Sequence, residues 1–325
     1  MLAEFNLIAE IFAPLAKDFP GALGLLDDAA IIRPRAGRDM VFTKDLMVSG
    51  VHFPEGESPE FVGRKLLRVN LSDLAAMGAE PVGYGLGVAF PEHIDESWLR
   101  AFASGLAKDQ ELFGISLMGG DTVATPGPIT LSLTALGDLP AGQALKRSSA
   151  RAGDLIMVSG TVGDGTLGLR AVLGELTGLS GINRAYLLDR LRLPQPRLTL
   201  GQGLRGVARA AVDISDGLVA DLGHICNASG LGASVHVDKI PLSGAATELL
   251  GAGGVDLLPA LLTGGDDYEL LFTVAPEDRD RVVALGARLN VPITEIGRMV
   301  EGESVTVLDS HDVPLAFQQS GYRHF

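Results

Sequence analysis

The sequence predicts an α/β (α+β) protein with two domains. Its 325 residues exceed what one hydrophobic core usually organises. Strand-like and helix-like segments alternate along the chain, a pattern that produces mixed sheets covered by helices. The pattern loosens over residues 138–152, so we place the domain boundary there, with domains at 1–140 and 141–325.

The elements of the first domain follow from periodicity and from end signals. Apolar residues recur at helical spacing in 2–17, and a strand is expected at about 40–48. Ser58 and Pro59 form a good helix start, a capping serine followed by proline at the first helical position, and this helix should end at Gly78. Strands are expected at 81–90 and 129–137, with a helix from Asp95 to about Phe113 between them.

The second domain alternates more regularly. Strands are expected at 154–160, 210–214 and 268–275, and helices at 165–176, 183–192 and 197–209, from Gly217 and from Glu277. These elements predict an α/β domain whose sheet has mixed strand order.

Composition argues against several functional classes. The net charge is −14 with only 26 basic residues, which argues against nucleic acid or an anionic membrane as the main partner. No apolar run reaches the roughly 18 residues that span a membrane, and the first residues do not resemble a signal peptide. The single cysteine, Cys226, excludes an intramolecular disulfide and is expected to pack in the core. We expect a cytoplasmic protein.

Carboxylates gather where apolar segments meet turns. They are Asp27 and Asp28, Asp45, Asp73, Asp121, Asp213, Asp216, and Asp266 and Asp267. Several carboxylates directed at one cleft repel each other unless a cation lies between them. Magnesium prefers hard oxygen ligands and usually binds through a few carboxylates together with substrate phosphates. The sequence therefore predicts phosphoryl chemistry on metal ions.

A helix cap is the simpler explanation for any one of these aspartates. It explains the two adjacent pairs poorly, because a cap needs a single carboxylate. Ser72-Asp73 and Ser215-Asp216 are each expected to precede a helix start. They could be caps, or they could direct a carboxylate and helix N–H groups at a metal-bound phosphate.

A glycine-rich segment gives a second functional interpretation. Gly163, Gly165 and Gly168 match the GxGxxG pattern of dinucleotide-binding units, with Asp189 at a suitable distance. The segment that follows looks helical rather than β, however, and Asp164 lies where a pyrophosphate would pass. The chain contains no Gly-Lys dipeptide and therefore no Walker A loop. We favour a glycine-rich turn that packs beside a phosphate site.

Six segments together are similar to the thiamine-monophosphate kinase family, within the aminoimidazole ribonucleotide synthetase superfamily. They are NLSDLAAMGAEP (70–81), GGDT (119–122), ALKRSSARAGDLIMVSGTVGDG (144–165), DISDGLVADLGHI (213–225), GGDDYELLFTV (264–274) and GYRHF (321–325). The resemblance covers nearly the whole chain in order. It implies a homodimer whose N-terminal mixed sheets form a shared barrel and bind ATP, with a C-terminal α/β domain closing over the site.

The same resemblance implies ATP-dependent phosphorylation of thiamine monophosphate to thiamine diphosphate, by direct in-line transfer with several Mg2+ ions. The implied metal ligands are Asp27, Asp28, Asp45, Asp73, Asp121, Asp213 and Asp216, and Thr43 joins them because it shares a strand face with Asp45. Asp45, Asp73, Asp121 and Asp216 would be catalytic. Nucleotide positions are Phe113, Gly120, Asp121, Arg147 and Ser215, and substrate positions are His52, Asp266 and Tyr322.

Three departures from the family pattern concern the site. Leu26 stands where glycine is usual, Lys44-Asp45-Leu46 replaces Thr-Asp-Thr, and Asp266 replaces a more common glutamate. Selenophosphate synthetase and the hydrogenase-maturation relative share the fold but need cysteines that this chain lacks. Another ATP-using member of the superfamily, or a non-catalytic module that binds Mg2+ and nucleotide, remains the alternative.

Overall fold

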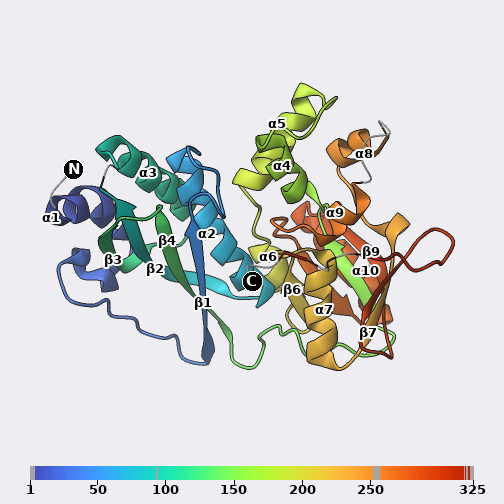
Figure 1. The fold of residues 1–325 in the computed structure, drawn as a ribbon. Coiled ribbons are helices and arrows are strands. Elements are labelled where there is room, and N and C mark those ends of the chain that lie inside the picture. The colour runs from blue at the N-terminus through green and yellow to red at the C-terminus, as the bar shows by residue number, and fades with distance from the viewer. Residues whose placement is uncertain (1–3, 93, 252–256, 318, 320, 323–325) are drawn as a thin grey trace. The chain divides into compact units, whose positions relative to one another are not determined.

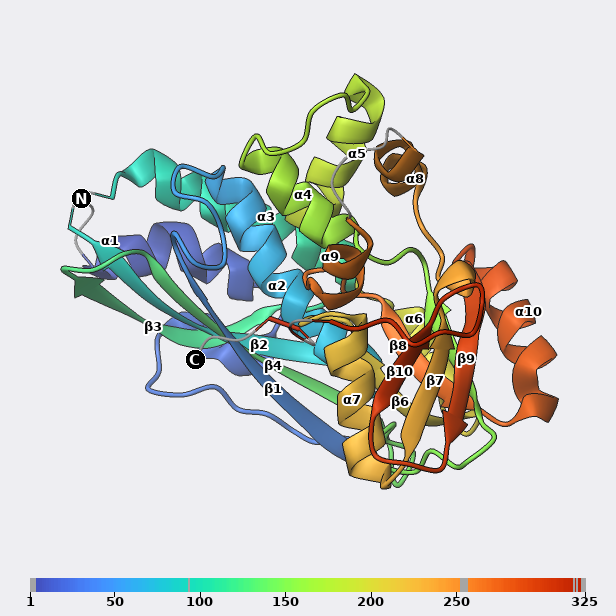
Figure 2. The same cartoon turned by 45° about the vertical axis from the view of Figure 1, so that its right-hand side comes forward.

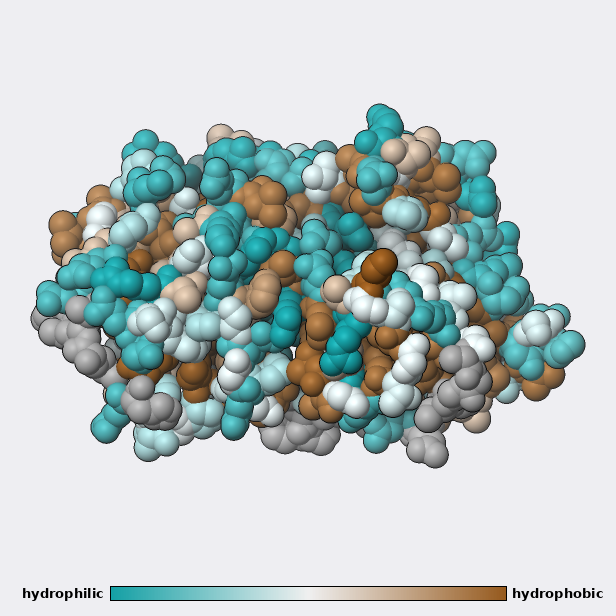
Figure 3. Space-filling model, turned by 90° about the horizontal axis from the view of Figure 1, so that it is seen from above, coloured by the Kyte–Doolittle hydropathy of each residue, from teal (hydrophilic) through white to brown (hydrophobic). Residues whose placement is uncertain are grey.

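The computed structural model describes residues 4–92, 94–251, 257–317, 319 and 321–322. The chain divides into two compact units, each with its own sheet (Figure 1). Unit 1 comprises Met1–Leu74 and Ala79–Gly142, and unit 2 comprises Ala75–Gly78 and Gln143–Phe325. No helix among the described residues is long and apolar enough to cross a membrane. Figure 3 shows one face of the molecule, on which separate hydrophobic patches lie among hydrophilic residues.

Unit 1 is built on a four-stranded sheet in the order β1-β4-β2-β3. The strands are β1 (Arg38–Val48), β2 (Glu80–Pro91), β3 (Leu117–Thr125) and β4 (Thr130–Pro140). Only the β2–β3 pair is parallel. The sequence predicted β1, β2 and β4 but missed β3, whose two glycines and Asp121 have poor strand propensity.

Helices α2 (Pro59–Ala76) and α3 (Glu96–Phe113) cover one face of this sheet (Figures 1 and 2). Both helices were predicted, and α3 begins at Asp95, whose side chain accepts the N–H of Trp98. The expected N-terminal helix is instead three short turns: α1 (Glu4–Leu7), the π-helical η1 (Ile8–Phe12) and the 3-10 η2 (Ala13–Ala16). Pro14 lacks the N–H that a regular helix needs there. Residues 2 and 3 of that predicted helix lie outside the described residues.

Unit 2 contains a six-stranded sheet in the order β10-β7-β9-β5-β8-β6. The strands are β5 (Leu155–Ser159), β6 (Ala208–Asp213), β7 (Gly232–His236), β8 (Leu270–Val274), β9 (Ile293–Val300) and β10 (Val305–Leu308). The predicted strands β5, β6 and β8 are confirmed, and each is fully or largely buried. The other three were missed because their short or polar segments carry little strand signal.

The helices of unit 2 are mostly short. They are α4 (Asp164–Val172), α5 (Gly181–Arg192), α6 (Leu198–Leu204), α7 (Leu218–Ser229), α8 (Gly244–Gly251), α9 (Leu258–Thr263) and α10 (Arg279–Leu289). Unit 2 also contains the 3-10 turns η4 (Val237–Lys239) and η5 (Pro276–Asp278). The remaining 3-10 turn, η3 (Pro20–Leu25), belongs to unit 1. The helix predicted over 197–209 ends five residues early, since Gly206 has a φ of 71° and β6 begins at Ala208.

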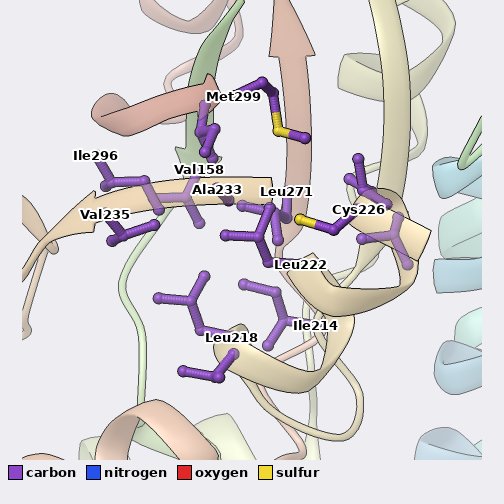
Figure 4. Close-up of a cluster of buried hydrophobic side chains, with 14 of the residues drawn as sticks. Val158, Ile214, Leu218, Leu222, Cys226, Ala233, Val235, Leu271, Ile296 and Met299 are labelled. Atoms are coloured by element: carbon purple, nitrogen blue, oxygen red, sulfur yellow. The ribbon is translucent and has the colours of Figure 1, made fainter. Parts of the chain in front are cut away.

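The core of unit 2 lies between α7 and the sheet (Figure 4). Leu218, Leu222 and Cys226 of α7 pack with Val158 of β5 and Leu271 of β8. Burial raises the pKa of the Cys226 thiol to about 11. A buried thiol with a raised pKa is a weak nucleophile, which confirms that Cys226 is a packing residue.

Candidate functional site

Three predicted metal ligands meet on β1 and α2. Thr43 Oγ1 donates a hydrogen bond to Asp73 Oδ2 at 2.5 Å. Burial, and then repulsion from Asp73, raises the pKa of Asp45 to about 7. Two neighbouring carboxylates with a hydroxyl form a set of hard oxygen donors suited to a divalent cation.

The position of Asp73 differs from the sequence expectation. It lies in the last turn of α2, which ends at Ala76, whereas Ser72-Asp73 was expected to precede a helix start. Negative charge is disfavoured near a helix C-terminus, where unpaired carbonyl groups point outward. Asp73 is therefore not a helix N-cap, and a nearby cation would compensate its charge.

A second group of predicted residues lines a cavity of about 400 Å³ within unit 1. Asp27, Asp28, Gly120 and Asp121 contribute to its wall, together with apolar residues of η1, β2 and β3. A Cβ at Gly120 would lie 2.0 Å from the carbonyl oxygen of Leu86, so only glycine allows β3 this close to β2. Leu26, which replaces the family's glycine, has an ordinary φ of −103° and 90% exposure, so the backbone there does not require glycine.

Asp45 and Asp121 point to opposite faces of the sheet. Asp45 pairs with Leu133, which pairs with Leu86, which pairs with Gly120, so Asp45 lies on the helix-covered face together with the buried Leu133 and Leu86. Asp121 belongs to the next row, with Gly87, Ser132 and Leu46, on the other face. Strands β1 and β3 are the two edges, separated by roughly 14 Å at the usual strand spacing. A single copy of unit 1 therefore does not gather all of its predicted ligands into one cluster.

In unit 2, two predicted loops lie side by side because β6 and β8 pair antiparallel. Asp213, at the end of β6, is opposite Leu270, at the start of β8. Beyond this pair, Tyr268 N donates to Ile214 O at 2.8 Å and Asp266 N donates to Ser215 O at 3.0 Å. The DISDG and GGDDYE segments thus form one surface, although Asp213 itself is only 3% exposed.

Asp221 holds the first of these loops and was missed by the sequence analysis. Its Oδ2 accepts the backbone N–H groups of Ser215, Asp216 and Gly217 at 3.0, 3.0 and 3.1 Å. Burial raises its pKa to about 7 in spite of these bonds. One ligand atom from each of Asp216, Asp221 and His224 lies within 4.8 Å of the others. An aspartate in the first turn of the helix that follows Ser215-Asp216 was the available sequence signal.

The C-terminal motif is attached to the same loop. Tyr322 N donates to the carbonyl oxygen of Asp216 at 3.0 Å, and a Cβ at Gly321 would lie 2.4 Å from that of Ala220. The structure therefore brings together Asp216 and Tyr322, predicted as metal and substrate residues, with half of the tyrosine exposed. Residues 323–325 of the GYRHF motif lie outside the described residues.

The remaining predicted residues have the following surroundings. His52 Nδ1 accepts the N–H of Val48 at 3.0 Å, just beyond β1. The Phe113 ring, at the end of α3, lies 5.2 Å from the Arg68 guanidinium carbon. Arg147 is exposed in a loop whose carbonyl group accepts from Ser229 Oγ.

The glycine-rich segment does not support the dinucleotide interpretation. The N–H groups of Gly163 and Gly165 donate to the Asp267 carboxylate at 2.7 and 2.9 Å. An internal carboxylate thus occupies the donors that would bind pyrophosphate. The element that follows α4 is a second helix, α5, rather than a strand.

The fold and the acidic loops define the class of AIR synthase related proteins. The N-terminal domain of that class matches residues 26–139, and its C-terminal domain matches residues 151–310. The structure of Escherichia coli HypE, a hydrogenase maturation protein, matches 98% of this chain and 98% of its own with a TM-score of 0.79. At 22% sequence identity, this similarity shows only that the two proteins share a fold.

Closer relatives narrow this class. The thiamine-monophosphate kinase of Caulobacter vibrioides is 48% identical over 93% of this chain and 86% of its own, and that of E. coli is 38% identical over 99% and 98%. The crystal structure of the Stenotrophomonas maltophilia enzyme has a TM-score of 0.84 at 46% identity, covering 94% of this chain and 96% of its own. The chain belongs to the thiamine-monophosphate kinase family.

Proposed function

We propose that the protein transfers the γ-phosphoryl group of ATP to thiamine monophosphate, giving thiamine diphosphate and ADP. The observation that carries this proposal is similarity along the whole chain to kinases of that name. A structure described as AaThiL complexed with AMPPCP and TMP matches 100% of this chain and 97% of its own, at 31% identity and a TM-score of 0.78. In the reaction, an oxygen of the acceptor phosphate bonds to the γ-phosphorus while the bond to the β,γ-bridging oxygen breaks.

The acidic residues fit magnesium. Thr43, Asp45 and Asp73 supply a hydroxyl and two carboxylates at one place, and burial, followed by repulsion from Asp73, raises the pKa of Asp45 to about 7. We propose that these residues, with Asp27, Asp28 and Asp121 in unit 1 and Asp213 and Asp216 in unit 2, hold Mg2+. Bound magnesium would neutralise phosphate charge, which is the main electrostatic requirement of phosphoryl transfer.

The chain itself has to position two phosphates. The acceptor phosphate is largely ionised at neutral pH, since its second pKa is about 6, so no protein nucleophile is required. We propose that Asp266, Tyr322 and His52 hold the acceptor. Phe113, Gly120, Asp121, Arg147 and Ser215 are proposed to contact the nucleotide, and Arg147 is exposed with a guanidinium that suits phosphate oxygens.

A homodimer is part of this proposal. Phe42, Leu46 and Val123 are 66%, 51% and 50% exposed, and all lie on the sheet face opposite the helices. A second copy that closes the sheet into a shared barrel would bury them and cover both open edges. Sedimentation velocity tests the proposed homodimer. We expect the wild type to be a dimer and Phe42→Glu to be a monomer, and a monomeric wild type would contradict the proposal. Because the reaction uses ATP, we place it in the cytoplasm.

The kinase activity is tested by measuring products directly. With ATP, Mg2+ and thiamine monophosphate, ADP and thiamine diphosphate should form one to one. Incubation with γ-labelled ATP alone, followed by denaturation, should leave the protein unlabelled; stable label would argue for a phosphoprotein intermediate instead. Binding of Mg-ATP without ADP formation would favour the non-catalytic alternative.

A further inference from the structure

The segment Gly163–Gly165 encloses a carboxylate from a distant part of the chain. Gly163 N and Asp267 are 104 residues apart in sequence and are joined at 2.7 Å, and Gly165 N adds a bond of 2.9 Å to the other oxygen of the same carboxylate. A Cβ at Gly165 would lie 2.4 Å from the carbonyl oxygen of Asp266. The glycines thus allow the loop to pack directly against residues 266 and 267.

A network of buried ionic groups surrounds Asp267. Asp267 is 1% exposed and Glu269 is 0% exposed. Arg190 Nη2 donates to the carbonyl oxygen of Asp267 at 3.1 Å and to Glu269 Oε1 at 3.0 Å, and Arg197 Nε donates to Glu269 Oε2 at 2.7 Å. Both the carboxylate and the backbone carbonyl group of Asp267 are therefore held by hydrogen bonds.

Asp266, between these anchors and the DISDG loop, has an unfavourable backbone conformation. Its φ is 71° and that of Tyr268 is 52°, a region in which L-residues other than glycine are strained. Such a conformation persists only where neighbouring contacts enforce it. Three contacts enforce it here. The Asp267 carboxylate accepts from the glycine-rich loop, Asp266 N donates to Ser215 O, and Tyr268 Oη donates to Asp266 Oδ1 at 3.0 Å.

We propose that Asp267 is a positioning residue for the acceptor substrate: by occupying the N–H groups of the glycine-rich loop, it holds Asp266 in the orientation that binds the phosphate-bearing substrate. This rests on the proposed function, in which Asp266 contacts thiamine monophosphate. Asp267 itself is buried and does not touch the substrate. The alternative is that Asp267 contributes to folding stability alone.

Substitution of Asp267 by asparagine separates these roles. The amide keeps the shape but can accept only through one oxygen, so one of the two loop N–H groups loses its partner. We expect the KM for thiamine monophosphate to rise at least about tenfold, because a hydrogen bond to a charged group is lost, while the KM for ATP stays within about twofold. Equal changes in both constants, or a lower melting temperature alone, would overturn the proposal.

Asp154 provides a matched control. It is also 1% exposed, accepts the N–H of Arg151 at 2.8 Å and pairs with Arg209 at 2.6 Å. It lies immediately before β5, away from residues 213–217 and 264–268 in sequence. Asp154→Asn should lower the melting temperature and leave both KM values unchanged. A rise in the KM for thiamine monophosphate in this control as well would show a general effect of destabilisation.

A second variant covers the case in which Asp267→Asn does not fold. Gly165→Ala keeps every charge and displaces the same backbone through its close contact with Asp266, so it should give the same selective rise in KM. Loss of the fold in both variants would overturn the proposal in favour of a structural role. If the wild-type protein makes no thiamine diphosphate, the proposed function itself is wrong. If the wild type is active and the variants change both KM values equally, only the role of Asp267 is wrong.

Discussion

Thr43 Oγ1 donates to Asp73 Oδ2, so a strand residue and a residue in the last turn of α2 are joined at 2.5 Å. Because the hydroxyl hydrogen is used in this bond, the lone pairs of Thr43 Oγ1 remain able to accept or to bind a cation. Asp45 lies two residues after Thr43 on β1, so the contact also brings Asp73 close to Asp45.

Substitution of Asp73 by asparagine should abolish most activity while the protein stays folded. The substitution removes one charge from the proposed metal ligands and little packing, so the loss should be several orders of magnitude in kcat/KM. Asp95→Asn is the control, since asparagine also caps helices well and Asp95 is the cap of α3. Near-normal turnover of Asp73→Asn at ordinary magnesium concentrations would show that Asp73 is structural.

Thr43 and its neighbour Lys44 give a paired test of the metal site. Lys44 pairs with Thr134 and is exposed on the sheet face opposite Thr43 and Asp45. Thr43→Val should therefore raise the magnesium concentration for half-maximal activity, whereas Lys44→Thr should leave it unchanged. If Lys44→Thr lowers the magnesium requirement instead, the residue takes part in metal binding despite its orientation.

The raised pKa of Asp45 predicts how stability depends on pH without magnesium. The folded state binds this proton with a pKa of about 7, against about 3.9 in the unfolded chain. Its contribution is thus fully present below about pH 4 and is lost as the pH rises through about 7. The melting temperature should fall between pH 5 and pH 8.

Asp45→Asn isolates this effect from the buried Asp221, whose pKa is also about 7. The variant should show a smaller fall in melting temperature over the same range, measured by calorimetry in the presence of a chelator. Magnesium should restore wild-type stability at pH 8 and have less effect in the variant. Identical pH profiles for the two proteins would refute the assignment.

Stability of unit 1 should depend on the buried pair between α2 and α3. Asp109 is fully buried and accepts from Arg68 Nε at 2.5 Å and pairs with Arg64 Nη2 at 2.9 Å. Asp109→Asn leaves the buried guanidinium of Arg68 without this carboxylate and should cost about 3–5 kcal/mol in the free energy of unfolding.

The control is Glu96→Gln, which removes an exposed pair with Arg100 on α3. Its cost should be below about 0.5 kcal/mol, because exposed ion pairs contribute little. Urea unfolding of both variants measures the difference. Similar costs for the two would mean that the Asp109 pair is compensated by other contacts.

Elements with strong local signals were predictable from the sequence. Ser58 and Pro59 correctly marked the start of α2, and Asp95 that of α3, since caps act on adjacent residues. Strand β3 was missed because its glycines suit close approach to β2, a tertiary requirement that local propensity does not report. Asp73 was misplaced for a related reason: a serine-aspartate pair looks like a helix start, but α2 continues through it.

The candidate site was predictable residue by residue and not as an arrangement. Family resemblance identified Ser215, Asp216 and Asp266, but their contact depends on antiparallel pairing of β6 with β8. Asp221 was missed although its bonds to Ser215, Asp216 and Gly217 are local in sequence. Asp267 was noted as one of the clustered carboxylates, but its contact with the glycine-rich loop spans 104 residues and could not be predicted. Likewise, only the strand register shows that Asp45 and Asp121 face opposite ways.

The strand order of unit 2 has a consequence for biosynthesis. Strand β5 lies between β8 and β9, and its Ser159 bonds to Glu269, which is 110 residues later in the chain. Long-range strand pairing makes folding slow, and translation proceeds at about 5–20 residues per second. Until the ribosome has synthesised β8 and β9, both edges of β5 lack their strand partners. The central strand of unit 2 is therefore without its partners during synthesis for longer than β2 of unit 1, whose neighbours β3 and β4 follow within about 60 residues.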